Sequence, residues 1–183
     1  MSNSSLTTEN LRKSVYCSLF TALIIIGAYI SIPIPISPVP IVLADFFVML
    51  AGLFLGTKHG LISVILYLSL GVIGLPVFSN AGGGIAFIFG PTGGFLLGYL
   101  PLVAIIGLST LSPKFSVVKY LALLLVGNIF LYLAGILWLN IMGNLNWSTS
   151  VAIGLVPFLP GTIVKIVVVL AIGRAFLNKD VEI

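Results

Sequence analysis

The segment IVLADFFVMLAGLFLGTKHGLISVILYLSLGVIGL, residues 41–75, decides the fold class. Two long apolar runs flank the short polar turn TKHG (57–60), and the only charged side chains of the segment are Asp45 and Lys58. A helix needs about 20 mostly apolar residues to cross the hydrocarbon core of a bilayer. Two such runs separated by a tight turn therefore predict two neighbouring membrane spans.

The composition of the whole chain extends this prediction. Of its 183 residues 60% are hydrophobic and 7% are charged, whereas soluble domains average about 25% charged residues. So few charges cannot cover a water-facing surface, so we expect one integral membrane domain. Cys17 is the only cysteine and allows no disulfide within the chain, and no cluster of cysteine and histidine predicts a metal site.

Apolar runs between breaker residues predict an all-α integral membrane protein with six transmembrane helices. The predicted spans are 15–32, 41–57, 60–75, 94–111, 119–142 and 151–173. The corresponding domains are a disordered polar N-terminus over 1–11, a six-helix membrane domain over 12–176 and a short cytoplasmic tail over 177–183.

The basic residues predict the orientation. The connections at 33–40, 76–93 and 143–150 contain no lysine or arginine. All but one of the basic residues fall on the other side of the six spans: Arg12, Lys13, Lys58, Lys114, Lys119, Arg174 and Lys179. The positive-inside rule then predicts that both termini are cytoplasmic. The membrane is expected to be the plasma membrane. The net charge of +4 is thus explained by basic residues on the cytoplasmic side of the spans, and no nucleic-acid partner is predicted.

Two connections on the uncharged side are unusual. IPIPISPVPIV (32–42) carries four prolines and is expected to be stiff and extended. LPVFSNAGGGIAFIFGPTGG (75–94) is rich in glycine and in apolar residues, so we expect it to fold back as a plug or lid over the outer mouth. Plain turn glycines are the alternative. Neither a phosphate-binding P-loop nor a dinucleotide-binding turn matches.

Two ionisable residues fall inside predicted spans, Asp45 and Lys165. Lys165 ends the motif FLPGTIVK (158–165), and Pro157, Pro160 and Gly161 break the span just before it. A lysine near the bilayer centre costs roughly 2.5–3.5 kcal/mol, so such residues usually pair or mark a binding site. One interpretation is a structural pair between Lys165 and Asp45. The other is a ligand site in which Lys165, aided by the N-terminus of a broken helix, binds an anionic group.

No enzyme or cofactor is predicted. The chain lacks a Ser/His/Asp set and an HExxH motif, and His59, the only histidine, is expected to be a solvated turn residue. It also lacks a Walker motif, so any ATP hydrolysis would come from other subunits.

Three segments, taken in order, resemble the BioY proteins, the biotin-binding membrane subunits of energy-coupling-factor (ECF) vitamin transporters. They are PVPIVLADFFVMLAGLFLGTKHGLISVILYLSLGVIGLPVF (38–78), GPTGGFLLGYL (90–100) and FLPGTIVK (158–165). The similarity runs from about residue 12 to residue 176. It implies the six-helix S-component fold, biotin bound toward the outer side, and docking on a membrane coupling subunit with two ABC-type ATPases.

The resemblance also implies roles for individual residues. Small residues of the first helix pack on the coupling subunit in the family, and Ser18 and Ala22 occupy those positions here, or are ordinary small residues of a span. The family lysine matches Lys165, but Thr162 stands where an acid is usual. Ala44 stands where glutamine is frequent, and Asp45 follows where an amide is common.

The glycine-rich loop departs from the family too, because Gly82 stands where a polar side chain is common. The implied ligand-binding residues are therefore Lys165, Thr162, Asp45, Asn80, Ser79, Gly82 and Gly83. An acid lost at 162 and gained at 45 would leave the net charge of the site unchanged.

The predicted function is high-affinity biotin capture and uptake as the substrate-binding subunit of an ECF-type transporter. One alternative is a solitary transporter that works as a homo-oligomer without dedicated ATPases. Another is uptake of a related carboxylate such as dethiobiotin, and a third is a receptor that binds the vitamin without transporting it.

Overall fold

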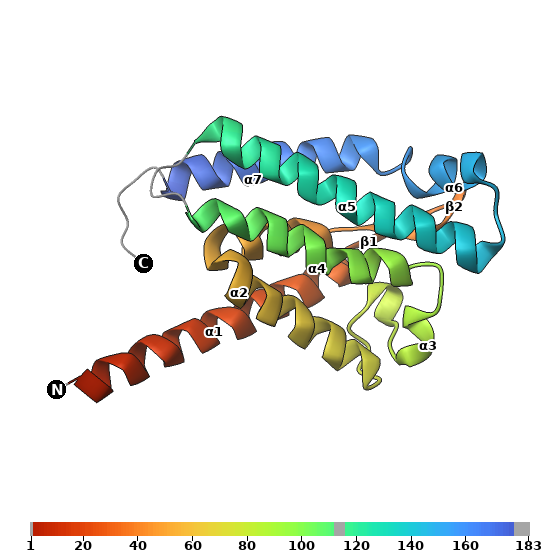
Figure 1. The fold of residues 1–183 in the computed structure, drawn as a ribbon. Helices are drawn as coiled ribbons and strands as arrows, with labels where there is room; N and C mark the ends of the chain where they lie inside the picture. The colour runs from red at the N-terminus through yellow and green to blue at the C-terminus, as the bar shows by residue number, and fades with distance from the viewer. Residues whose placement is uncertain (1, 112–115, 178–183) are drawn as a thin grey trace.

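Long helices make up most of the chain in the computed structural model, which describes residues 2–111 and 116–177 (Figure 1). The elements are α1 (Ser2–Tyr29), β1 (Ser31–Ile34), β2 (Ser37–Val42), α2 (Ala44–Val72), the 3-10 turn η1 (Ser79–Ala81), α3 (Ile85–Ile88), α4 (Gly93–Gly107), the 3-10 turn η2 (Leu108–Leu111), α5 (Val117–Gly143), α6 (Trp147–Gly154) and α7 (Leu159–Leu177).

Among the described residues, five helical segments are long and apolar enough to cross a membrane. They are Leu11–Tyr29, Ala44–Val72, Gly93–Leu111, Val117–Gly143 and Leu159–Leu177. The chain is thus a multi-pass membrane protein, as predicted. Five segments stand in place of the six predicted spans because the second and third spans lie in the single helix α2.

A sharp kink divides α2 at Gly56. This glycine has φ 71° and ψ −178°, a left-handed backbone angle that side chains with a Cβ rarely adopt. Helical backbone resumes at Thr57. The turn therefore lies at Gly56, one residue before the predicted turn over 57–60. His59 is therefore a half-buried residue of α2, and our prediction of a solvated turn residue was wrong.

The kink packs closely on α4. A Cβ added to Gly107 would lie 2.2 Å from the backbone nitrogen of Thr57, and the Thr57 hydroxyl donates to the carbonyl of Ala104 at 2.9 Å. Small residues allow helices in a membrane to approach in this way. Together with α5, these two helices enclose the core around Val48, Leu102 and Leu124.

The proline-rich segment forms a small antiparallel hairpin of β1 and β2, with Ser31 opposite Val42 and Ile34 opposite Ser37. The prediction that residues 32–42 are extended is confirmed. Strand pairing was not expected, because each proline removes a backbone donor. Buried Val39 and Pro40 face the helices.

The glycine-rich segment packs back onto the helices through Phe78, whose side chain is fully buried. Its ring stacks on Phe87 at 5.2 Å and meets Tyr67 edge-on at 5.4 Å. A Cβ on Gly71 would lie 1.9 Å from this ring, so Gly71 provides the space for it. In Figure 1 the segment, with α3, lies at the same end of the molecule as α6.

The N-terminal end of the chain differs from the domain prediction. Helix α1 begins at Ser2, whereas residues 1–11 were expected to be disordered. An ion pair between Lys13 and Glu9, one helical turn apart, and the Arg12 guanidinium 5.7 Å from the ring centre of Tyr16 favour helix in this region. Residues 178–183 of the predicted tail lie outside the described residues.

The predicted sixth span, 151–173, is interrupted as expected, at Pro157 and not at Pro160–Gly161. Helix α6 ends at Gly154 and α7 begins at Leu159, so the break covers residues 155–158. Pro160 stands in the first turn of α7, where its missing N–H costs little.

Candidate functional site

A buried ion pair joins α2 to α7. The Nζ atom of Lys165 lies 2.7 Å from Oδ1 and 2.9 Å from Oδ2 of Asp45, and 2.7 Å from the carbonyl oxygen of Val42. The two side chains are 12% and 9% exposed. Asp45 stands in the first turn of α2, where the helix dipole favours a negative charge. The sequence interpretation of a pair between these two residues therefore has the geometry it requires.

All three N–H donors of the Lys165 ammonium group have acceptors. An ammonium group has three N–H donors, and the three acceptors just named satisfy them. A ligand carboxylate that binds Lys165 must therefore replace or share one of these acceptors. The opposite charges are balanced within the site, which is the condition for keeping them out of water.

Aromatic side chains wall the cavity beside the ion pair. A cavity of about 40 Å³ is lined by Val39, Pro40, Ile41, Val42, Asp45, Phe95, Tyr99, Leu131, Tyr132, Phe158 and Lys165. A second cavity of about 30 Å³ shares Val39, Pro40, Val42, Phe95 and Tyr99 with it and is also lined by Ala28, Ala44, Tyr67, Ser79, Thr92 and Leu96. The two cavities share a wall and are lined mainly by apolar side chains with few polar groups, which is the lining, though not the volume, of a small-molecule pocket.

The hydroxyl groups of Tyr67 and Tyr99 are the main polar groups that the sequence did not indicate. Both residues are buried, and neither hydroxyl bonds another described residue. Tyr99 borders both cavities, and Tyr67 borders the second. These residues carry little signal in the sequence, because tyrosine in an apolar span also occurs at lipid-facing and interfacial positions.

Thr162 reaches the site only through a neighbour. Its hydroxyl bonds the hydroxyl of Tyr132, and both residues are buried. Tyr132 lines the cavity next to Lys165, whereas Thr162 lines a groove on the outside of α5 and α7. Thr162 therefore contacts the wall of this cavity through Tyr132, which the sequence did not single out.

The predicted residues of the glycine-rich loop separate into two groups. Ser79 is buried and borders the second cavity. Asn80 and Gly83 line an outer cavity of about 430 Å³, which Ser79 and Pro40 also border. Gly82 has a packing role, because a Cβ there would lie 2.1 Å from the ring of Phe87.

The expected helix terminus is not beside Lys165. The lysine lies six residues after Leu159, the first residue of α7, which is more than one helical turn inside the helix. The prediction that the start of this broken helix lies at the lysine was wrong, because the break precedes Pro160. The helix start nearest to the ammonium group is that of α2, which carries Asp45.

Ser18 and Ala22 are exposed on α1, away from the side that packs on α2. That buried side includes Cys17 and Thr21, whose side chains donate to the carbonyls of His59 and Ser63. Larger exposed residues flank the small pair: Leu11, Val15, Leu19, Ile26 and Tyr29. The result is a shallow apolar face with two small residues at its centre.

Known proteins are similar to this chain in sequence and in fold. Residues 1–180 match the sequence pattern of the BioY family. The chain is 38% identical to the biotin transporter BioY of Thermotoga maritima over 94% of this chain and 99% of that protein. It is 42% identical to a probable biotin transporter BioY of Pyrococcus horikoshii, over 81% of this chain and 85% of that protein.

A solved structure agrees with these relatives. The crystal structure of an S-component for biotin from an ECF-type ABC transporter matches with a TM-score of 0.87 and 34% identity, over 98% of this chain and 95% of that chain. The relatives are named as transporters. Because the family pattern covers nearly the whole sequence and the named relatives agree with it, this chain belongs to the BioY family.

Proposed function

We propose that this chain captures biotin and delivers it across the membrane as the substrate-binding subunit of an ECF-type transporter. The observation that carries the proposal is the buried pair of Lys165 and Asp45 at the end of an aromatic cavity. Biotin is an apolar fused ring and chain with a carboxylate at one end and a urea group at the other. The protein needs no catalytic residue or cofactor for this role.

Each part of biotin has a matching group in the site. Lys165 is the cation for the carboxylate, and Phe95 and Phe158 supply apolar ring surface. The hydroxyls of Tyr67 and Tyr99 supply donors for the urea oxygen. Asp45, Ser79 and Asn80 are further polar groups along the same row of cavities. A site of this kind holds its ligand by apolar burial and orients it by a few polar contacts.

Direct titration of the purified chain with biotin, dethiobiotin and lipoate tests the proposed ligand. We expect biotin to bind most tightly, because only biotin combines the carboxylate, the urea group and the second ring. Tightest binding of dethiobiotin would assign the chain to that related carboxylate. Absence of binding to all three would contradict the proposal.

Asp45→Asn tests how the carboxylate is bound. The change leaves Lys165 buried without its counter-ion, which destabilises the ligand-free protein by roughly 3–5 kcal/mol. A ligand carboxylate restores the ion pair, so we expect a lower melting temperature without biotin and a larger rise when biotin is added. Melting curves with biotin and with biotin methyl ester measure this, and the ester should give no enlarged rise.

Two other outcomes of that experiment have definite meanings. Weaker biotin binding in Asp45→Asn would mean that Asp45 accepts a urea N–H and that Lys165 does not hold the carboxylate. Unchanged affinity would contradict the idea that Asp45 replaces the acid usually found at position 162.

The proposed assembly follows from the same function. In this proposal each part of α2, before and after the kink at Gly56, crosses the membrane once, so that the chain would cross six times with both termini in the cytoplasm of the plasma membrane. In Figure 1 the start of α1, the start of α5 and the end of α7 lie at one end of the molecule, and their basic residues favour this orientation. A membrane coupling subunit with two ABC-type ATPases would dock on the face around Ser18 and Ala22.

Ala22→Trp tests the docking face. Ala22 is exposed and lines neither of the cavities beside the ion pair, so we expect the purified variant to bind biotin as the wild type does. A bulky ring would prevent close helix approach, so uptake of labelled biotin by cells with the coupling subunit and ATPases should fall to background. Val126→Trp, on an exposed face of α5, is the matched control and should retain uptake.

Unchanged uptake in Ala22→Trp would exclude this face as the docking surface. Uptake by the purified wild-type chain alone in liposomes would instead support a solitary, homo-oligomeric transporter. Retention of label in the cell envelope, without delivery inside, would support a receptor.

A further inference from the structure

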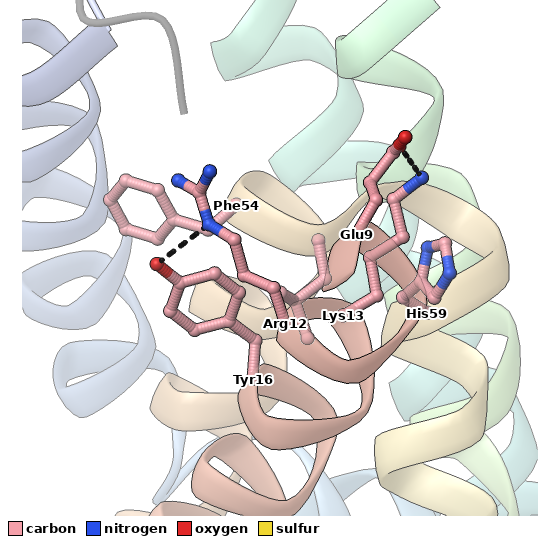
Figure 2. Close-up of a pocket in the computed structure, with 7 residues that line it drawn as sticks. Glu9, Arg12, Lys13, Tyr16, Phe54 and His59 are labelled. Atoms are coloured by element: carbon pink, nitrogen blue, oxygen red, sulfur yellow. Dashed lines mark hydrogen bonds and ion pairs between the residues drawn. The ribbon is translucent and has the colours of Figure 1, made fainter. Parts of the chain in front are cut away.

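A separate cavity lies between the start of α1 and the kink of α2 (Figure 2). Its volume is about 360 Å³, and it is lined by Glu9, Arg12, Lys13, Tyr16, Phe54, Leu55 and His59. Arg12 is about 24 Å along the helix axis from Ala28, which borders the biotin site. No residue of this cavity lines the cavities beside Lys165.

The polar wall of this cavity carries an uncompensated positive charge. Lys13 pairs with Glu9, and the hydrogen bond and charge of the lysine lower the pKa of the Glu9 carboxyl. Arg12 uses only its Nε, which donates to the Tyr16 hydroxyl at 3.4 Å. Within the described part of the chain, its two terminal nitrogens and the imidazole of His59 bond no other side chain or carbonyl. Two donors therefore face the cavity without an acceptor.

The other wall is apolar and lies at the edge of the membrane. Phe54 and Leu55 belong to α2, and the Phe54 ring also contacts Phe20 and Phe176 at 6.4 and 6.3 Å between ring centres. The apolar span of α1 begins at Leu11, so the cavity straddles the boundary between water and hydrocarbon. A soluble anion needs only the polar wall, whereas a phospholipid uses both.

We propose that this cavity binds the headgroup of an anionic phospholipid. The phosphate accepts from the Arg12 guanidinium and from His59, and the acyl chains follow the apolar wall beside Phe54. Basic pockets between membrane helices are suited to such headgroups, and guanidinium matches phosphate geometry. Tyr16 lies about 160° around α1 from Ser18. Lipid and coupling subunit therefore occupy different sides of the helix.

Native mass spectrometry of the purified full chain in detergent tests the site. The probes are phosphatidylglycerol and phosphatidylcholine with identical acyl chains. We expect phosphatidylglycerol to be retained more strongly, and Arg12→Gln to reduce that retention about fivefold. Lys119→Gln is the matched control, because it removes one positive charge at the same basic end but outside the cavity, and it should change retention little. A melting temperature equal to that of the wild type shows that each variant is folded.

Three results would overturn the site. They are equal retention of the two lipids, equal effects of Arg12→Gln and Lys119→Gln, and displacement of phosphatidylglycerol by millimolar inorganic phosphate or by its headgroup without acyl chains. If Arg12→Gln does not fold, His59→Gln replaces it, with the same expected direction and the same control. None of these outcomes depends on biotin being the transported ligand, because the lipid assay contains no transport step.

Discussion

We expect Lys165→Ala to abolish high-affinity biotin binding. The substitution removes the one cation among the described residues that line the cavity, and it leaves Asp45 buried without its ion-pair partner. Loss of one member of a buried charged contact typically costs about 2–5 kcal/mol, which is roughly thirtyfold to several thousandfold in the dissociation constant. Calorimetric titration of the purified variant with biotin measures the change.

A second variant separates ligand binding from folding. In Lys165→Ala/Asp45→Ala both charges are removed, so no unpaired charge is buried and the melting temperature should recover toward the wild-type value. Biotin affinity should stay low, because the cation is still absent. Lys119→Ala, a basic residue outside the cavity, should bind biotin normally. If Lys165→Ala bound biotin with wild-type affinity, this cavity would not be the biotin site.

Gly107→Ala has the largest effect on stability that we expect from a change in helix packing alone. The new Cβ would lie 2.2 Å from the backbone nitrogen and 2.5 Å from the Cα of Thr57. These are backbone atoms at the kink of α2, so no side chain can rotate out of the way. Overpacking of this kind costs roughly 1–3 kcal/mol or more. Melting curves in detergent should show a clearly lower transition temperature than for wild type.

Gly161→Ala is the matched control for that experiment. It is the same chemical change inside a helix, but no atom lies within 4 Å of the new Cβ. Alanine favours helix over glycine by about 0.5–1 kcal/mol, so the control should be neutral or slightly more stable. Equal melting temperatures for Gly107→Ala and wild type would show that α2 and α4 are not packed as described.

The sequence predicted a helical membrane protein because its apolar runs are long enough for helices to cross the bilayer. It could not reveal that residues 44–72 form one kinked helix, since a single glycine makes the turn and helical backbone resumes at the next residue. The start of α1 was also missed. Its polar composition suggested disorder, while the contact of Lys13 with Glu9 favours helix.

The candidate site was predictable where charge was involved. Asp45 and Lys165 stood out because ions are costly in hydrocarbon, and the structure brings them together. Tyr99 and Tyr132 were not predictable, because an aromatic residue in a span has the same pattern whether it faces lipid or a cavity. The role of Thr162 depends on its contact with Tyr132, 30 residues away, which no local pattern contains.

The ion pair has a dynamic consequence for α7. Only 22% of the residues in the apolar window of α7 are buried, against 56% for α2. The rest of this span faces lipid, which packs on an apolar helix as well as protein does, so few contacts resist a small displacement of α7. The ion pair between Lys165 and Asp45 ties this helix to the more deeply buried α2. A ligand that takes over the ammonium group therefore loosens this tie, and the distance between labels on α2 and α7 becomes a record of occupancy.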